Sequence, residues 1–280
     1  MTGVEITIRR LYTPEEMAAA VDLQKVYWGE NMGDLVPSHM LTSITNYGGH
    51  LHGAFVGDKM VGMLLGFLGA DIKCENHQNA PERMLIMSKR MVVLPQYRGH
   101  KIGENLKLAQ AKYARQHGIQ LVTWTFDPLL SRNAYLNLHK LGAVGQKYFE
   151  DYFGMASADS VLGADRLVMN WWVRHPHVKN HPELDLSNTP VANVVSLSPN
   201  GLLVPQEFRL PKHAIIRLEI PIEFQPIINI DSDLAQRWRD HVRLSFQHLL
   251  EARFIATDFT RLENRVFYVF THDDGTFDFT

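Results

Sequence analysis

The chain has 280 residues, of which 45% are apolar and 21% are charged, as in ordinary globular proteins. A formal net charge of −2 gives no overall field that would attract nucleic acid or an anionic membrane. The single cysteine, Cys74, excludes an intrachain disulfide and favours a reducing, cytoplasmic location. The first residues do not resemble a signal peptide, and no apolar run approaches the roughly 18 residues of a membrane span.

The first part of the chain combines helix and hairpin signals. Thr13-Pro14-Glu15-Glu16 is typical of a helix start, with a capping residue, an early proline and early acids. Gly57-Asp58 separates two apolar runs and predicts the turn of a hairpin. The expected elements are a strand at 4–9, helices at 14–27 and 37–46, hairpin strands at 50–56 and 60–68, and a loop at 71–81 that contains Cys74.

The middle of the chain has the clearest periodicity. Ile102, Leu106, Ala109 and Tyr113 fall on one helix face, and Gly118 is placed to end that helix. Strands are expected at 84–94, 119–126, 143–152 and 166–173, with a second helix from Ser131, its capping residue, to Leu141. The order strand, turn, helix, strand, helix, strand predicts an α/β fold, a mixed sheet with helices on both faces.

The pattern weakens after residue 174 and then returns. Prolines and polar residues make 177–200 resemble a linker, and a strand at 215–220, a helix at 233–253 and a strand at 266–270 follow. The expected organisation is a main domain at 1–176, a linker at 177–200 and a smaller C-terminal α/β extension at 201–280.

The segment Met91–Gly103 carries the strongest functional signal. A β-branched run ends at Pro95, and a short turn with Gly99 and Gly103 leads directly into a helix. Free backbone N–H groups at such a helix start attract phosphate oxygens. The glycine spacing fits neither the nucleoside triphosphate loop nor the dinucleotide fingerprint.

These residues resemble the hallmark segment of the GNAT superfamily of acyl-CoA N-acyltransferases. The likeness lies in Val92-Val-Leu-Pro-Gln-Tyr-Arg-Gly-His-Lys-Ile-Gly103, which opens its turn with Arg98 and closes it with Gly103. Lys101 departs from the pattern because glycine is usual there, but a lysine with negative φ can still donate its N–H. The resemblance covers about residues 4–173 and implies a GNAT-like, mostly antiparallel mixed sheet.

The resemblance also implies a site for acetyl-CoA as co-substrate, without a metal. The pyrophosphate is expected on turn amides, the pantetheine arm on two strand residues, and Asn133 either on the coenzyme or as a helix cap. The cofactor-binding candidates are therefore Met91, Val93, Arg98, Gly99, His100, Lys101, Ile102, Gly103 and Asn133. Lys107 is expected to reach the adenosine phosphate.

Catalytic residues follow less directly from the resemblance. The usual acid of the family is a tyrosine at the position that Leu138 occupies here, so Tyr135, one turn earlier, is the candidate acid, with core packing as its alternative. Tyr148 and Tyr152 are further candidates for the acid. Asp127 is the expected base or acceptor anchor, with a loop cap before Pro128 as its alternative.

Other side chains have more ordinary interpretations. Trp124 is a substrate-binding candidate, and Arg90 and Thr125 also lie near strand ends. His50 and His52 face one side of a strand, either in an acceptor pocket or as partly exposed residues. Three histidines lie close together in the sequence at His175, His177 and His181, but no HExxH motif and no cysteine pair accompanies them, so a metal site is not expected. A mixed, solvated helix face is expected for Arg237, Arg239 and Arg243.

The function predicted from the resemblance is acetyl-CoA-dependent N-acyltransfer to an unidentified amine by direct transfer in a ternary complex. The acceptor is expected to be a small molecule or a peptide amine; nucleic acid and membrane are not expected partners, and a homo-oligomer is compatible with the sequence. Two alternatives stay open: a non-catalytic GNAT-like module that binds acyl-CoA or a partner, and an acyltransferase acting on a hydroxyl.

Overall fold

The computed structural model describes residues 5–71, 83–154, 164–180 and 184–279, arranged in two compact units. The first unit comprises residues 1–124 with Phe279, and the second comprises residues 125–278 with Thr280. Cys74, His181 and all of the predicted loop except Asp71 lie outside the described residues.

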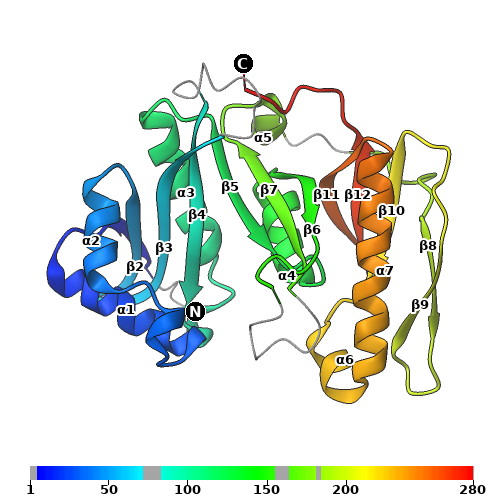
Figure 1. The fold of residues 1–280 in the computed structure, drawn as a ribbon, viewed down its shortest axis with the longest axis horizontal. Coiled ribbons are helices and arrows are strands. Elements are labelled where there is room, and N and C mark those ends of the chain that lie inside the picture. The colour runs from blue at the N-terminus through cyan, green and yellow to red at the C-terminus, as the bar shows by residue number, and fades with distance from the viewer. Residues whose placement is uncertain (1–4, 72–82, 155–163, 181–183, 280) are drawn as a thin grey trace. The chain divides into compact units, whose positions relative to one another are not determined.

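The first unit contains the elements that the sequence predicts up to the helix after the glycine turn (Figure 1). They are β1 (Thr7–Arg10), α1 (Pro14–Trp28), α2 (Ser38–Asn46), β2 (His50–Val56), β3 (Lys59–Ala70), β4 (Met84–Val93), α3 (Ile102–Gln116) and the start of β5 (Leu121–Phe126). The strands follow the order β1-β2-β3-β4-β5, antiparallel except for the parallel pair β4–β5. This mixed, mostly antiparallel arrangement is the predicted fold class.

Helices cover both faces of this sheet (Figure 1). α1 begins at a capping box, in which the Thr13 hydroxyl accepts from the Glu16 N–H at 3.3 Å and the Glu16 carboxylate accepts from the Thr13 N–H at 3.0 Å. Met17, Leu51 and Val61 belong to the apolar core, which also takes up Ile102 and Leu106 of α3.

A β-bulge interrupts β4 between Ser88 and Arg90. Leu65 of β3 pairs with Arg90, whereas the next residue, Gly66, pairs with Ser88, so Lys89 is an extra residue in β4. A bulge changes the side to which the following side chains point. Ser88 contacts Lys107 of α3, while Arg90 lies over the ring of Trp28 at the end of α1.

The strands of the second unit follow the order β7-β6-β11-β12-β10, each antiparallel to its neighbour, and β8 and β9 form a two-stranded sheet. Its elements are α4 (Ser131–Ala134), a π-helix (Tyr135–Lys140), β6 (Val144–Phe149), β7 (Arg166–Trp172), α5 (Pro176–Asn180), β8 (Asn193–Leu197), β9 (Leu203–Phe208), β10 (Ile215–Ile220), α6 (Gln225–Ile230), α7 (Ser232–Glu251), β11 (Phe254–Leu262) and β12 (Arg265–His272).

Several of these elements were not predicted. The strand expected at 266–270 is one arm of the β11–β12 hairpin, and β11 follows α7 without a glycine to mark the joint, because Arg253 takes the left-handed conformation with φ 63°. The linker-like stretch contains α5 and β8, and β8 pairs only with β9 among the described strands. No helix in the described ranges is both long and apolar enough to cross a bilayer.

Candidate active site

The turn between β4 and α3 is tightly folded and exposed. Residues Pro95–Tyr97 form one 3₁₀ turn, closed by the Arg98 N–H, which donates to the Pro95 carbonyl at 3.2 Å. Gly99 follows with φ 86°, a conformation that favours glycine, and a side chain added there would meet nothing within 4 Å. The turn therefore leaves open space directly before α3.

Five consecutive amides of this turn are available to a ligand. Within the described residues, the N–H groups of Gly99, His100, Lys101, Ile102 and Gly103 make no hydrogen bond to the protein, and the first α3 bond is donated by Asn105 to the Lys101 carbonyl at 2.9 Å. The prediction that the Arg98 amide is also free is not supported, because that amide closes the 3₁₀ turn.

The backbone conformation of Lys101 differs from the one expected from the sequence. Its φ is 58°, in the left-handed region, and not negative as expected. Glycine adopts this conformation without the steric penalty that a Cβ imposes. The lysine thus takes the backbone shape that a glycine would take, and it presents its N–H from the same turn.

β4 separates from its parallel neighbour next to this turn. The β4–β5 ladder joins Leu85, Ile86 and Met87 to the segment Leu121–Thr123, whereas β4 itself continues to Val93. Met91 and Val93, the two residues expected to bind the pantetheine arm, lie in the part of β4 beyond this ladder. Beyond the ladder, the β4 backbone is not paired with β5, so a pantetheine arm could form hydrogen bonds with it there.

Buried polar side chains lie under this part of the sheet. The Lys107 ammonium donates to the Ser88 hydroxyl at 2.8 Å and to the Gln110 amide oxygen at 3.4 Å, and it sits 3.4 Å from the centroid of the Trp124 ring. Lys107 is only 3% exposed, and burial holds its pKa well below the usual range. The prediction that Lys107 reaches a phosphate at the surface is therefore wrong, and Trp124 is a core residue beside it.

The two histidines of β2 join the same buried region. His50 contacts the Gln110 amide at 2.9 Å, and its ring lies 5.1 Å from that of His52. Both are buried rather than partly exposed, and burial lowers the pKa of His50 to about 2 and that of His52 to about 4. Both rings are therefore neutral near pH 7 and face α3, which rules out the partly exposed interpretation.

Comparison with known proteins identifies the first part of the chain. A model of the acetyltransferase (GNAT) family matches residues 15–143. These residues form a GNAT acetyltransferase domain. The matched range of the GNAT domain includes the glycine turn, β4, α3 and β5.

Solved structures that resemble this chain include two N-acetyltransferases and a third protein bound to acetyl-CoA. The ribosomal-protein-S18-alanine N-acetyltransferase of Escherichia coli is 14% identical, with a TM-score of 0.47, over 60% of this chain and 94% of that one. The Drosophila melanogaster polyamine N-acetyltransferase is 12% identical, with a TM-score of 0.46, over 59% and 99%. The protein yncA of Salmonella typhimurium, solved with its cofactor acetyl-CoA, is 14% identical, with a TM-score of 0.45, over 62% and 97%. No curated protein sequence matches the chain.

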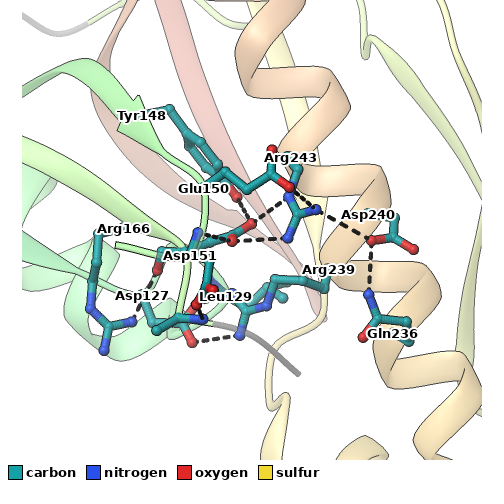
Figure 2. A network of polar contacts seen from close by, with 12 residues as sticks. Asp127, Leu129, Tyr148, Glu150, Asp151, Arg166, Gln236, Arg239, Asp240 and Arg243 are labelled. Atoms are coloured by element: carbon teal, nitrogen blue, oxygen red, sulfur yellow. Dashed lines mark hydrogen bonds and ion pairs between the residues drawn. The ribbon is translucent and has the colours of Figure 1, made fainter. Parts of the chain in front are cut away.

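Asp127, the expected base, is already paired. Its two carboxylate oxygens accept hydrogen bonds from Arg239 of α7, both at 2.7 Å, and one of them also accepts from the Leu129 N–H at 2.9 Å (Figure 2). Both oxygens of this carboxylate are therefore already engaged in contacts within the protein. This geometry favours the loop-cap alternative for Asp127, and it shows that Arg239 is not on a solvated face.

A second ion pair stands beside the first. Arg243 of α7 donates through Nε and Nη2 to the carboxylate of Asp165, at 2.9 and 3.0 Å, and through Nη1 to Glu150 at 2.7 Å (Figure 2). The Tyr148 hydroxyl donates to the same Asp165 at 2.7 Å. Burial, followed by the Asp165 charge, raises the pKa of Tyr148 well above its usual value, so Tyr148 is a poor candidate for the acid.

The other tyrosines and Asn133 stay open to ligands. Leu138, in the slot of the usual acid, is fully buried, whereas Tyr135 is 37% exposed and stacks on His139 with ring centroids 4.7 Å apart. Tyr135 begins the π-helix, a distortion that is frequent at functional sites. Asn133 is exposed and does not cap its helix, because Leu130 is the N-cap residue; Ser131, the expected cap, bonds instead to the Ile222 carbonyl.

The structure thus brings together the turn and β4 candidates, all in the first unit, whereas Asp127, Asn133 and Tyr135 belong to the second. Ser88 was missed by the sequence analysis, and its signal was the polar run Ser88-Lys89-Arg90 in an otherwise apolar strand. In the part of the chain that the structure describes, no three metal-ligating side chains come together.

Proposed function

We propose that the chain is an acetyl-CoA-dependent N-acyltransferase that transfers the acyl group directly to an amine. The observation that carries this proposal is the row of five unpaired amides, Gly99 to Gly103, placed where β4 leaves β5 inside a GNAT domain. An anion at this row satisfies donors that the protein leaves free and lies at the positive end of α3.

The residues of the turn fit a coenzyme A pyrophosphate. The turn is exposed, the space beside Gly99 is open, and the side chains of Arg98 and Lys101 are exposed and cationic. We propose that the backbone of Met91 and Val93 bonds to the pantetheine arm beyond the end of the β4–β5 ladder. The bound co-substrate supplies an acyl group activated as a thioester.

The chain needs few further groups for such a transfer. As the amine nitrogen bonds to the acyl carbon, the carbon–sulfur bond breaks, the amine loses a proton, and the departing thiolate gains one. We propose Tyr135 as the donor of that last proton because its side chain is exposed, whereas that of Tyr148 is buried and bonded to Asp165. Holding the amine and the acyl group in contact supplies most of the remaining acceleration.

A non-catalytic acyl-CoA-binding module is the second candidate function. Leu138, fully buried where the family usually has its acid, favours it. Release of free thiol from acetyl-CoA with pooled amines, dependent on the acceptor and on intact Gly99, supports the enzyme. Tight binding of acetyl-CoA without thiol release from any amine supports the module, and absence of binding rejects both.

A further inference from the structure

Arg90 forms no ion pair with any of the residues that the structure describes. Its Nε and Nη1 groups are buried and have no hydrogen-bond partner among the described residues. A buried N–H on a charged group that finds no acceptor is destabilising, by more than a neutral one. Such a group in a folded protein therefore calls for a specific explanation.

Three other arginines of this chain each have a matching acid. Arg239, Arg243 and Arg265 each donate two hydrogen bonds to a single carboxylate, from Asp127, Asp165 and Glu219 respectively. At each of these three places the chain supplies an acid that matches the guanidinium. No such acid lies within ion-pair distance of Arg90 in the described part of the chain.

The surroundings of Arg90 are arranged to hold it in place. Its guanidinium carbon lies 4.3 Å from the centroid of the Trp28 ring, and Val92, on the same strand, is buried in the core. Burial lowers the pKa of Arg90, and the charge of Asp34, in the segment between α1 and α2, acts in the opposite direction. Stacking on an indole fixes the plane of a guanidinium while leaving its N–H groups free to bond.

Arg90 also has a defined place relative to the proposed acyl site. It follows the β4 bulge, in the stretch beyond the β4–β5 ladder where the pantetheine arm is proposed to lie. The bulge separates it from Ser88, which bonds to Lys107 of α3, and directs Arg90 toward Trp28 of α1. The free N–H groups thus lie on the α1 side of β4, beside the proposed acyl path.

We propose that Arg90 is a specificity-determining residue that binds a carboxylate of the substrate, which makes the reaction an acylation involving a carboxylate-bearing partner. This inference rests on the proposed function. The carboxylate has two sources, an amino-acid acceptor or the far end of a dicarboxylic acyl chain. Charge-assisted hydrogen bonds from arginine to a carboxylate are among the stronger polar contacts available to proteins.

The test compares matched substrates on the full chain. In one arm, acetyl-CoA is the donor and α-amino acids are compared with their carboxamides as acceptors. In the other arm, plain alkylamines are the acceptors and succinyl-CoA is compared with acetyl-CoA as donor. We expect wild type to prefer the carboxylate member in one arm, and Arg90→Met to raise KM for that member about ten- to a hundredfold while leaving its uncharged counterpart unchanged.

Two variants keep the test independent of folding. Arg90→Lys retains a cation and should restore part of the preference, and Lys89→Met, the exposed neighbour in the bulge, should leave it intact. Arg90→Met should also raise the melting temperature of the ligand-free protein, because it removes a buried donor without a partner. If no acceptor turns over, binding is measured instead, as the shift in melting temperature that each carboxylate compound causes in the presence of coenzyme A. Wild type should then show a larger shift than Arg90→Met.

The outcomes separate the two proposals. If wild type shows no preference for a carboxylate in either arm, or if the preference survives Arg90→Met, the assignment of Arg90 is overturned while acetyl-CoA binding and transfer still stand. If coenzyme A does not bind at all, the proposed function itself fails.

Discussion

Asp127 and Arg239 form a two-point ion pair, with both N–O distances 2.7 Å, although 112 positions separate them in the chain. Arg239 is 3% exposed, so the charge of one residue is compensated mainly by the other (Figure 2). Since the same carboxylate also accepts from the Leu129 N–H, the pair connects α7 to the loop that follows β5.

Asp127→Asn should therefore act on stability first. We expect it to lower the free energy of unfolding by about 3–5 kcal/mol, because it leaves a buried guanidinium without its anion. Urea denaturation measures this loss, and the affinity for acetyl-CoA should not change.

The matched control for this pair lies on the same helix. Arg239→Met should be destabilising, whereas Arg237→Met, at an exposed α7 position, should change stability by less than about 0.5 kcal/mol. A variant Asp127→Asn that is as stable as wild type but loses turnover would show that Asp127 is the base after all.

Gly99→Ala should weaken acetyl-CoA binding by distorting the turn. Its φ of 86° is unfavourable for alanine, so we expect a loss of about 1 kcal/mol in stability and at least a tenfold rise in Kd. Titration calorimetry gives the Kd, and thermal unfolding gives the stability.

Gly57→Ala offers a control with the same strain at another place. Gly57 has φ 56° in the β2–β3 hairpin turn, and, as at Gly99, an added side chain would meet nothing within 4 Å. It should lose similar stability without any change in Kd. Equal effects of both substitutions on Kd would mean that the turn has no special role in binding.

Local signals predicted the elements around the turn, and they failed where partners far along the chain decide the outcome. The capping residue Thr13 and the face of Ile102 and Leu106 gave α1 and α3 because these signals lie within one element. Arg239 looked like one member of a charged helix face, and only the fold brings Asp127 to it. The β4 bulge was equally hidden, since it depends on how β3 pairs with β4.

In the candidate site, too, features set by neighbouring residues were predicted, and features set by distant residues were not. The turn was located correctly because its glycines and the helix start are contiguous in sequence, whereas the left-handed φ of Lys101 was not expected from a lysine. Lys107 was expected to reach the adenosine phosphate, and its burial could not be predicted because the Ser88 hydroxyl that accepts its hydrogen bond comes from another element.

The buried histidines predict a loss of stability in mild acid. Their pKa values, about 2 for His50 and about 4 for His52, lie below the usual 6.5. Between each lowered pKa and 6.5, the histidine is therefore neutral in the folded state and protonated in the unfolded state. Stability therefore falls as the pH drops below 6.5, by about 2 kcal/mol for each histidine at pH 5.

Urea denaturation at pH 7.5, 6 and 5 measures this dependence. His52→Gln should reduce the slope between pH 6.5 and 5, and His39→Gln, exposed on α2, should leave the slope as it is in wild type. An unchanged slope in His52→Gln would mean that His52 is protonated in the folded protein.

Tyr135→Phe tests the proposed acid. Removing the hydroxyl should lower kcat about a hundredfold, within the usual range for acid–base groups, without altering the Kd of acetyl-CoA. Tyr47→Phe, at an exposed tyrosine that is not a candidate for the acid, is the control and should keep wild-type kcat. Turnover of Tyr135→Phe within twofold of wild type would remove Tyr135 from the mechanism.

The central claim is that the amides of Gly99 to Gly103 hold the pyrophosphate of coenzyme A, and a crystal structure of the full chain with acetyl-CoA tests it most directly. We expect phosphate oxygens within about 2.7–3.2 Å of these backbone nitrogens, with the arm along β4 beyond Met87. Acetyl-CoA bound elsewhere, with this turn empty or filled by the protein's own side chains, would contradict it.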